Sequence, residues 1–255
     1  MRPPAVAGSF YPEDPAELRT TIEELLAGVR PETDNAPAYV VPHAGYRWSG
    51  PTAAHVYRRL AGRAAERVIL LGPAHRVPLR GAAVPAESAW STPLGTVTID
   101  MEAAGELVGG GLAVADDVPH APEHALEVQL PLLQVLGFSE VLPVAIGVAG
   151  AQEVAALLAK VAAPGSIVLC STDLSHYLTQ EQAEAADART VDAIVRLDAD
   201  GIGERAACGR YALRGLLAWA RGLDLGVRVL HQATSGDEGG PRDRVVGYLA
   251  ASLGA

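Results

Sequence analysis

Short apolar runs alternate along this chain with longer segments in which apolar residues recur at helical spacing. Apolar runs bounded by glycine or proline are typical of buried strands, and repeats every three or four positions are typical of helices that cover a sheet. The pattern predicts strands at 38–41, 67–72, 81–85, 95–99, 141–146, 166–170, 227–231 and 245–250. It predicts helices at 14–29, from 49 or 50 to 60, and at 101–108, 125–136, 152–162, 180–197 and 209–221.

Strands and helices therefore alternate from one end of the chain to the other. This alternation is typical of the α/β class, in which helices flank a central, mostly parallel sheet. The glycines at 109–111 make only a short break, and no repeat or linker suggests a domain boundary. We predict a single α/β domain over residues 1–255.

Composition narrows the classes of partner. The net charge of −10 disfavours nucleic acid and anionic membrane surfaces, because both repel an acidic protein. Hydrophobic residues make up 49% of the chain, yet no apolar run is long enough for a membrane span and no secretory signal is visible. The two cysteines do not form a disulfide framework. These features predict a cytoplasmic enzyme or binding protein.

Three histidines follow the ends of predicted buried strands: His43, His75 and His176. The carboxyl ends of parallel strands share one edge of a sheet, so these imidazoles are expected to meet in one crevice. Imidazole is a common metal ligand and a general base near neutral pH. A single histidine is more often structural, but three at equivalent positions indicate a site.

The other four histidines are less informative. His55 lies within a predicted helix and is expected to be structural. His231 ends a late strand and either supports the site or has no role there. His120 and His124 belong to a polar loop that either lines the crevice or faces solvent.

Three further residues are candidates for chemistry. Cys208 precedes a predicted helix, where a thiol has a lowered pKa, so it is a potential ligand or nucleophile; the alternative is a small buried apolar residue, as we expect for Cys170. Asp173 could orient His176, take a proton itself, or be a turn residue. Glu127 could hydrogen-bond a ligating histidine or face water. There is no phosphate-binding loop, dinucleotide fingerprint, paired zinc motif or nucleophile elbow.

Several motifs occur in a fixed order. They are Arg2–Pro12, Pro42–Tyr46, Gly72–His75, Ser91–Gly95, Glu123–Glu127, Asp173–His176, Cys208–Arg210, Ser235–Asp237 and Arg244–Tyr248. Together they span nearly the whole chain and resemble the Memo family, whose prokaryotic members are often called AmmeMemoRadiSam system protein B.

The resemblance implies a fold similar to that of class III extradiol dioxygenases, in which two histidines and a glutamate hold non-haem iron(II). In the Memo pattern His43 and His75 are the two histidines, and Cys208 replaces the carboxylate. His176, with Asp173 beside it, takes the place of the acid/base histidine. The resemblance implies iron or copper binding and redox chemistry, with AMMECR-type and radical SAM proteins as partners.

Ligand chemistry leaves the metal open. A thiolate favours copper(I) or zinc over a hard cation, while three protein ligands would also leave room for oxygen and substrate on iron(II). We expect iron(II) or copper, with zinc fitting less well.

Two functions compete, with a weaker third. The first is a metal-dependent oxidoreductase whose unknown small molecule or peptide binds against Tyr46, Trp48 and Tyr177. The second is a non-catalytic module that binds a peptide or protein in the same crevice through Arg47 and Arg210. The third is zinc-dependent hydrolysis.

Overall fold

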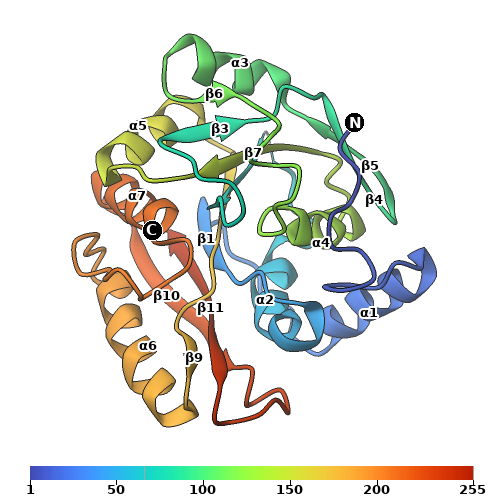
Figure 1. The fold of residues 1–255 in the computed structure, drawn as a ribbon, viewed down its shortest axis with the longest axis vertical. Helices are drawn as coiled ribbons and strands as arrows, with labels where there is room; N and C mark the ends of the chain where they lie inside the picture. The colour runs from blue at the N-terminus through green and yellow to red at the C-terminus, as the bar shows by residue number, and fades with distance from the viewer. Residues whose placement is uncertain (66, 255) are drawn as a thin grey trace.

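A twisted sheet with the strand order β10-β11-β1-β8-β2-β7-β3-β6 runs through the computed structural model, which describes residues 1–65 and 67–254 (Figure 1). Its strands are β1 Ala38–Val41, β2 Val68–Pro73, β3 Ala82–Val84, β4 Ala89–Thr92, β5 Gly95–Ile99, β6 Val114–Ala115, β7 Glu140–Ile146, β8 Ile167–Ser171, β9 His176–Leu178, β10 Gly226–Thr234 and β11 Val245–Gly254. The helices are α1 Pro15–Ala27, α2 Tyr46–Leu60, α3 Met101–Gly109, the 3-10 turn η1 Glu127–Gln129, α4 Leu130–Val135, α5 Ala151–Val161, α6 Gln180–Val195 and α7 Arg210–Gly222.

The centre of the sheet is parallel and its margins are not. β1, β8, β2 and β7 pair in parallel, as their helical crossovers require. β11 runs antiparallel to both β1 and β10, and β3 runs antiparallel to β7. The sheet is therefore mixed, and the prediction of a mostly parallel sheet describes its centre only. β10 and β11 are consecutive strands joined by one loop, which allows them to pair as a hairpin.

Helices cover both faces of the sheet, so the central strands are buried throughout. The side chains of β1 alternate between two cores: Val40 packs with α3, α5 and α7, and Tyr39 packs with α1, α2 and α4. Figure 1 shows these two helical layers on opposite sides of the strands. The result is a single α/β domain, as the alternating pattern predicts. Within the described residues, no helix combines the length and apolarity needed to cross a membrane.

Most predicted elements are present, with local differences. α2 begins at Tyr46, before the predicted start at 49 or 50, because its first backbone N–H donates to the Phe10 carbonyl (2.8 Å). The predicted helix at 125–136 starts as the 3-10 turn η1. The local pattern does not predict strands β4, β6 and β9; each is short and defined by pairing with a distant strand or by a hairpin partner.

Candidate functional site

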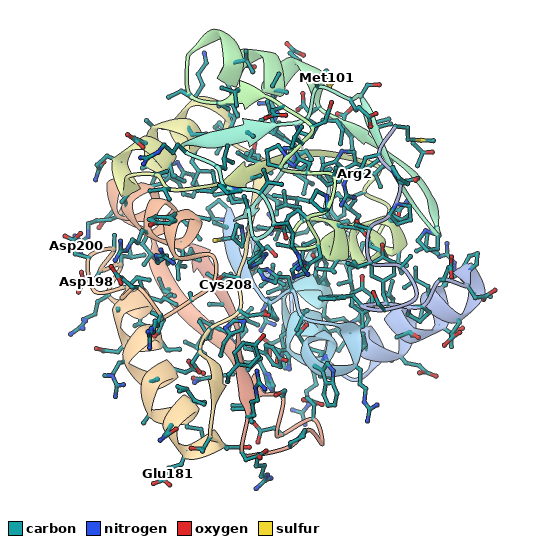
Figure 2. The ribbon with its side chains drawn as sticks, in the orientation of Figure 1. Arg2, Met101, Glu181, Asp198, Asp200 and Cys208 are labelled. Carbon is teal, nitrogen blue, oxygen red and sulfur yellow. The ribbon has the colours of Figure 1, made fainter. Side chains whose placement is uncertain are left out.

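The carboxyl edge of the parallel strands carries a cavity of about 450 Å³. His43 follows β1, His75 follows β2, and Asp173 and His176 follow β8. Cys208 reaches the same cavity from the segment before α7, and Figure 2 places it near the middle of the molecule. The structure thus brings the predicted metal ligands and the predicted acid/base residues to one place.

The three predicted ligands lie at a spacing that suits one ion. His43, His75 and Cys208 each offer a donor atom, and these atoms all lie within 4.8 Å of one another. Cys208 Sγ is 3.2 Å from His43 Nε2, and the backbone N–H of Asp173 donates to the same sulfur at 3.2 Å. His43 is buried, while His75 is partly open to the cavity. An ion among them would face the cavity on one side.

Hydrogen bonds fix the tautomer of His43. The single hydroxyl proton of Ser171 is donated to the Ala125 carbonyl (2.7 Å), and Gln129 Nε2 donates to Ser171 Oγ (2.8 Å). Ser171 Oγ therefore accepts from His43 Nδ1 (2.9 Å), so Nδ1 carries the proton. The lone pair of Nε2 is left free and lies next to Cys208.

The carboxylate of Glu123 fixes the tautomer of His75 in a similar way. Glu123 is 2% exposed; it accepts from the His75 backbone N–H at 2.5 Å and from its ring Nδ1 at 2.9 Å. His75 therefore also has Nε2 free for a ligand, in the arrangement by which carboxylates orient metal-binding imidazoles. Burial raises the pKa of Glu123, but hydrogen bonds from His75 and Ala125 outweigh it and bring the pKa to about 2.

The supporting role predicted for Glu127 is wrong, because Glu127 has other partners. Glu127 is fully buried and pairs with Arg2 (Nη1–Oε2 2.7 Å). It also accepts from the Tyr11 hydroxyl (2.6 Å) and from the backbone N–H groups of Ala5 and Val6. Glu127 therefore anchors the N-terminal arm, residues 2–11. Both glutamates flank the same short segment, and spacing alone could not distinguish them.

His124 joins the site, a role that the sequence leaves open. Its ring stacks on that of His75 with centroids 4.9 Å apart and lies 5.4 Å from that of His43. With His75 and Glu123 it forms a second group whose donor atoms lie within 4.8 Å. Phe10, on the N-terminal arm, packs against the His124 ring at 4.7 Å and also lines the cavity.

His176 and Asp173 both line the cavity but do not pair with each other. His176 Nδ1 donates to the Leu174 carbonyl (2.8 Å), which leaves Nε2 as the acceptor. Asp173 Oδ1 instead accepts from the His43 backbone N–H (2.8 Å). The predicted orientation of His176 by Asp173 is therefore replaced by a backbone contact, and Asp173 positions the chain at His43.

Burial keeps most of these groups neutral. Desolvation, followed by the charge of His75, lowers the pKa of His43 to about 3. Desolvation and the charge of His43 lower the pKa of His124 to about 4. The lowered pKa predicted for Cys208 is wrong: burial, with the negative charge of Asp173, raises its pKa to about 12, despite opposing backbone hydrogen bonds.

The three residues predicted to contact the substrate lie in different places. Tyr177 lines the cavity, is 64% exposed, and has the Arg244 guanidinium 4.4 Å from its ring centroid. Trp48 is not among the cavity-lining residues and packs against the Arg47 guanidinium at 4.6 Å. Tyr46 is buried, and its hydroxyl donates to the Val128 carbonyl (2.7 Å). Only Tyr177 of the three faces the histidine cluster.

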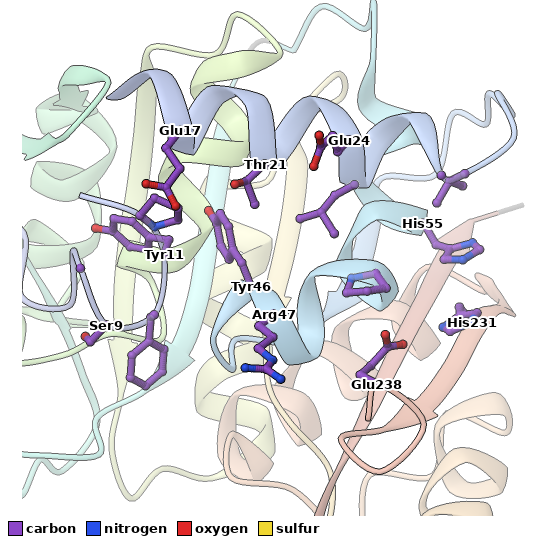
Figure 3. A pocket seen from close by; sticks show the side chains of 17 residues that line it. Ser9, Tyr11, Glu17, Thr21, Glu24, Tyr46, Arg47, His55, His231 and Glu238 are labelled. Carbon is purple, nitrogen blue, oxygen red and sulfur yellow. The ribbon is translucent and has the colours of Figure 1, made fainter. Parts of the chain in front are cut away.

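Tyr46 instead lines a neighbouring cavity of about 680 Å³ (Figure 3). This second cavity lies between α1 and α2 and also contains Arg47. His55 and His231 stack there with ring centroids 4.4 Å apart, so the two imidazoles that the sequence left without a role pack on each other. Phe10 lines both cavities and forms their common wall.

Comparisons with known proteins place the chain in a family. A family model described as Memo-like protein matches residues 2–252. A MEMO1 family protein of Methanopyrus kandleri is 41% identical over 98% of this chain and 97% of its own length. MEMO1 family proteins of Desulfurococcus amylolyticus (35%, covering 98% and 97%) and Sulfolobus acidocaldarius (36%, covering 100% and 99%) are similar over equally long stretches. The chain belongs to the Memo family.

Proposed function

We propose that this protein is a metal-dependent oxidoreductase that binds iron(II) or copper through His43, His75 and Cys208. One observation carries the proposal: the donor atoms of these three residues lie within 4.8 Å of one another on the wall of a cavity. Cys208, a neutral thiol without metal, would release its proton on binding the ion, and two imidazoles and a thiolate on one side of the ion leave other coordination positions for exogenous ligands.

The surroundings of these residues fit a metal. The Nδ1 atoms of His43 and His75 are each engaged by an acceptor, Ser171 and Glu123, so each ring presents Nε2 as a donor. When bound, a redox-active metal would supply electron-transfer and oxygen chemistry that protein side chains lack. Copper suits the thiolate better, and iron(II) suits the resemblance to extradiol dioxygenases.

The remaining residues have separate tasks in this proposal. His176 accepts or returns a proton at Nε2, because its Nδ1 is committed to the Leu174 carbonyl. Phe10 and His124 form one wall of the substrate site, and the exposed Tyr177 forms its rim. His43 is buried and Cys208 is partly buried, which limits the access of bulk water to the ligand side of the cavity.

Family membership supports the finer parts of the proposal. We infer a fold and reaction type similar to those of class III extradiol dioxygenases, with oxygen and a phenolic substrate as reactants. The prokaryotic family name supports AMMECR-type and radical SAM proteins as partners. Both cysteines are free, as is usual in the cytoplasm, where we place the protein.

The test is metal analysis of protein purified without oxygen. We expect the wild type to retain iron or copper and the Cys208→Ser variant to lose most of it. Cys170→Ala is the matched control: Cys170 is also a free cysteine, but it is buried in β8 and does not line the cavity. Equal metal content in the wild type and Cys208→Ser would show that Cys208 is not a ligand.

The binding-module alternative places Arg47 and Arg210 in the histidine crevice, but neither residue lines it. One observation favours a binding role elsewhere: Arg47 lines the cavity of Figure 3. Arg210 donates to the Tyr211 hydroxyl (3.0 Å) and is not among the residues lining that cavity. Loss of peptide binding in Arg47→Ala with unchanged metal content would favour this alternative. Strong zinc occupancy without iron or copper would favour the hydrolase.

A further inference from the structure

A third cavity, of about 430 Å³, lies between β9, α6 and the segment leading to Cys208. Its lining includes Arg189 on α6, Arg205 on that segment, and Ser175 next to β9. His176 lines this cavity as well as the histidine crevice, so the two cavities share a side chain. We refer to it as the arginine cavity.

The charged residues that line the arginine cavity are both arginines, whereas the protein as a whole is acidic. The chain carries a net charge of −10, yet no aspartate or glutamate is among the residues that line this cavity. Among the described residues, neither Arg189 nor Arg205 forms an ion pair. Arg196, seven positions after Arg189, does pair, with Asp192 at 2.7 Å. Two guanidinium groups thus stay free to bind an anion.

A buried hydroxyl adds an unused donor. Ser175 is 3% exposed, and its hydroxyl has no hydrogen-bond partner among the described residues. A buried polar group without a partner is costly, unless a ligand or water satisfies it. The adjacent Asp187 accepts from the Ser175 backbone N–H (3.0 Å) and does not line the cavity.

We propose that the arginine cavity binds the phosphate group of a small phosphorylated molecule. A single guanidinium group can bind two oxygens of a phosphate at once. Arg189 and Arg205 lie on different elements, so each can engage different oxygens of a tetrahedral group. The Ser175 hydroxyl supplies a further donor. The volume exceeds that of a phosphate, and Leu178 and Ala186 give the organic part an apolar wall.

The arginine cavity lies next to the histidine crevice. A phosphate there lies beside His176, and Arg205 is three residues before Cys208. Neither arginine nor Ser175 is a proposed metal ligand, so anion binding stands apart from the metal proposal and can fail or succeed without it.

The experiment is titration calorimetry of the full chain at low salt with phenyl phosphate, inorganic phosphate and phenol. We expect phenyl phosphate to bind, inorganic phosphate to bind more weakly, and phenol not to bind at this site. Arg189→Gln and Arg205→Gln should each weaken phenyl phosphate binding by roughly tenfold or more, since charged hydrogen bonds are lost. Arg196→Gln is the matched control: Arg196 is exposed, as are Arg189 and Arg205, but it forms a salt bridge and does not line the cavity, so this variant should bind as the wild type does.

Three results would overturn the proposal. They are absence of phenyl phosphate binding to the wild type, equal loss of affinity in Arg196→Gln, and full affinity in both cavity variants. Equal affinity for inorganic and phenyl phosphate would overturn the assignment of an organic ligand. Metal content is measured alongside and should not change in any arginine variant, which separates a failure here from a failure at the metal site.

Discussion

Replacing Glu127 with glutamine tests whether this buried carboxylate holds the N-terminal arm or the metal site. Its two oxygens accept from the Tyr11 hydroxyl, from two backbone N–H groups of the arm, and from Arg2. Arg2 also donates to the carbonyls of His120 and Glu123, at 2.7 and 2.6 Å. An amide offers one acceptor oxygen in place of two and carries no charge. The substitution therefore leaves Arg2 buried without its counter-ion.

The expected effect is large. Removing one partner of a buried ion pair destabilises a protein by about 3 to 5 kcal/mol, because the other charge stays buried without compensation. The arm can move outward and expose Arg2 to water, so we expect a value near the lower end, about 3 kcal/mol. For a domain of this size, that corresponds to a fall in melting temperature of roughly 6 to 12 °C.

Two measurements distinguish the roles. Thermal unfolding should show the fall in melting temperature for Glu127→Gln, and hydrogen exchange should show loss of protection in residues 2–11. Metal content should stay near that of the wild type. Glu140→Gln, which changes an exposed glutamate at the start of β7, is the matched control and should change neither the melting temperature nor the protection of residues 2–11. A normal melting temperature together with lost metal would refute the anchoring role and restore Glu127 as a support for the ligands.

Three further predictions follow from individual contacts. Glu123→Gln should weaken metal binding by about 10- to 100-fold in a competition titration, because His75 loses its carboxylate partner; unchanged affinity would contradict this. Burial lowers the pKa of His120 from 6.5 to about 4, so its neutral form stabilises the fold above pH 6.5 and this contribution is lost as the pH falls toward 4. Denaturant unfolding should show the wild type losing roughly 3 kcal/mol more than His120→Gln over that interval, and parallel pH profiles would argue against it. Gly215→Ala should destabilise by about 1 to 3 kcal/mol in thermal unfolding, since a Cβ there would lie 2.2 Å from Val154 Cβ, and an unchanged melting temperature would contradict this.

The sequence predicted the fold class and the convergence of the histidines because both depend on local pattern and simple topology. Buried strands followed directly by histidine or aspartate put these residues at one edge of the sheet, where His43, His75 and His176 line one cavity. The parallel centre of the sheet follows from helical crossovers, which the alternating pattern already contains. The antiparallel margins depend on where β10 and β11 dock, and no local pattern specifies this.

The hydrogen bonds that hold the site residues in place could not be predicted from the sequence, because they join distant segments of the chain. Glu123 and Glu127 occupy one short segment, yet one holds His75 from 48 residues away and the other holds Tyr11 from 116 residues away. Local periodicity carries no information about which partner each carboxylate meets. The sequence of the arm is irregular because the arm is held by hydrogen bonds to distant segments, such as the Glu127 side chain and β4, rather than by regular elements of its own.

At Cys208 the effect of the helix N-terminus, which lowers the pKa of a thiol, is smaller than the opposing effect of burial. A helix N-terminus favours a nearby thiolate by about 0.3 to 1 kcal/mol at exposed sites, and this effect underlies the lowered pKa predicted from the sequence. A rise from 9.0 to about 12 corresponds to roughly 4 kcal/mol in favour of the neutral thiol. Desolvation is the largest cause, and the carboxylate of Asp173, 35 positions earlier in the chain, adds to it. Both effects arise from tertiary packing and together they exceed that of the helix, so the position of Cys208 before α7 indicates where the thiol lies but not its protonation state.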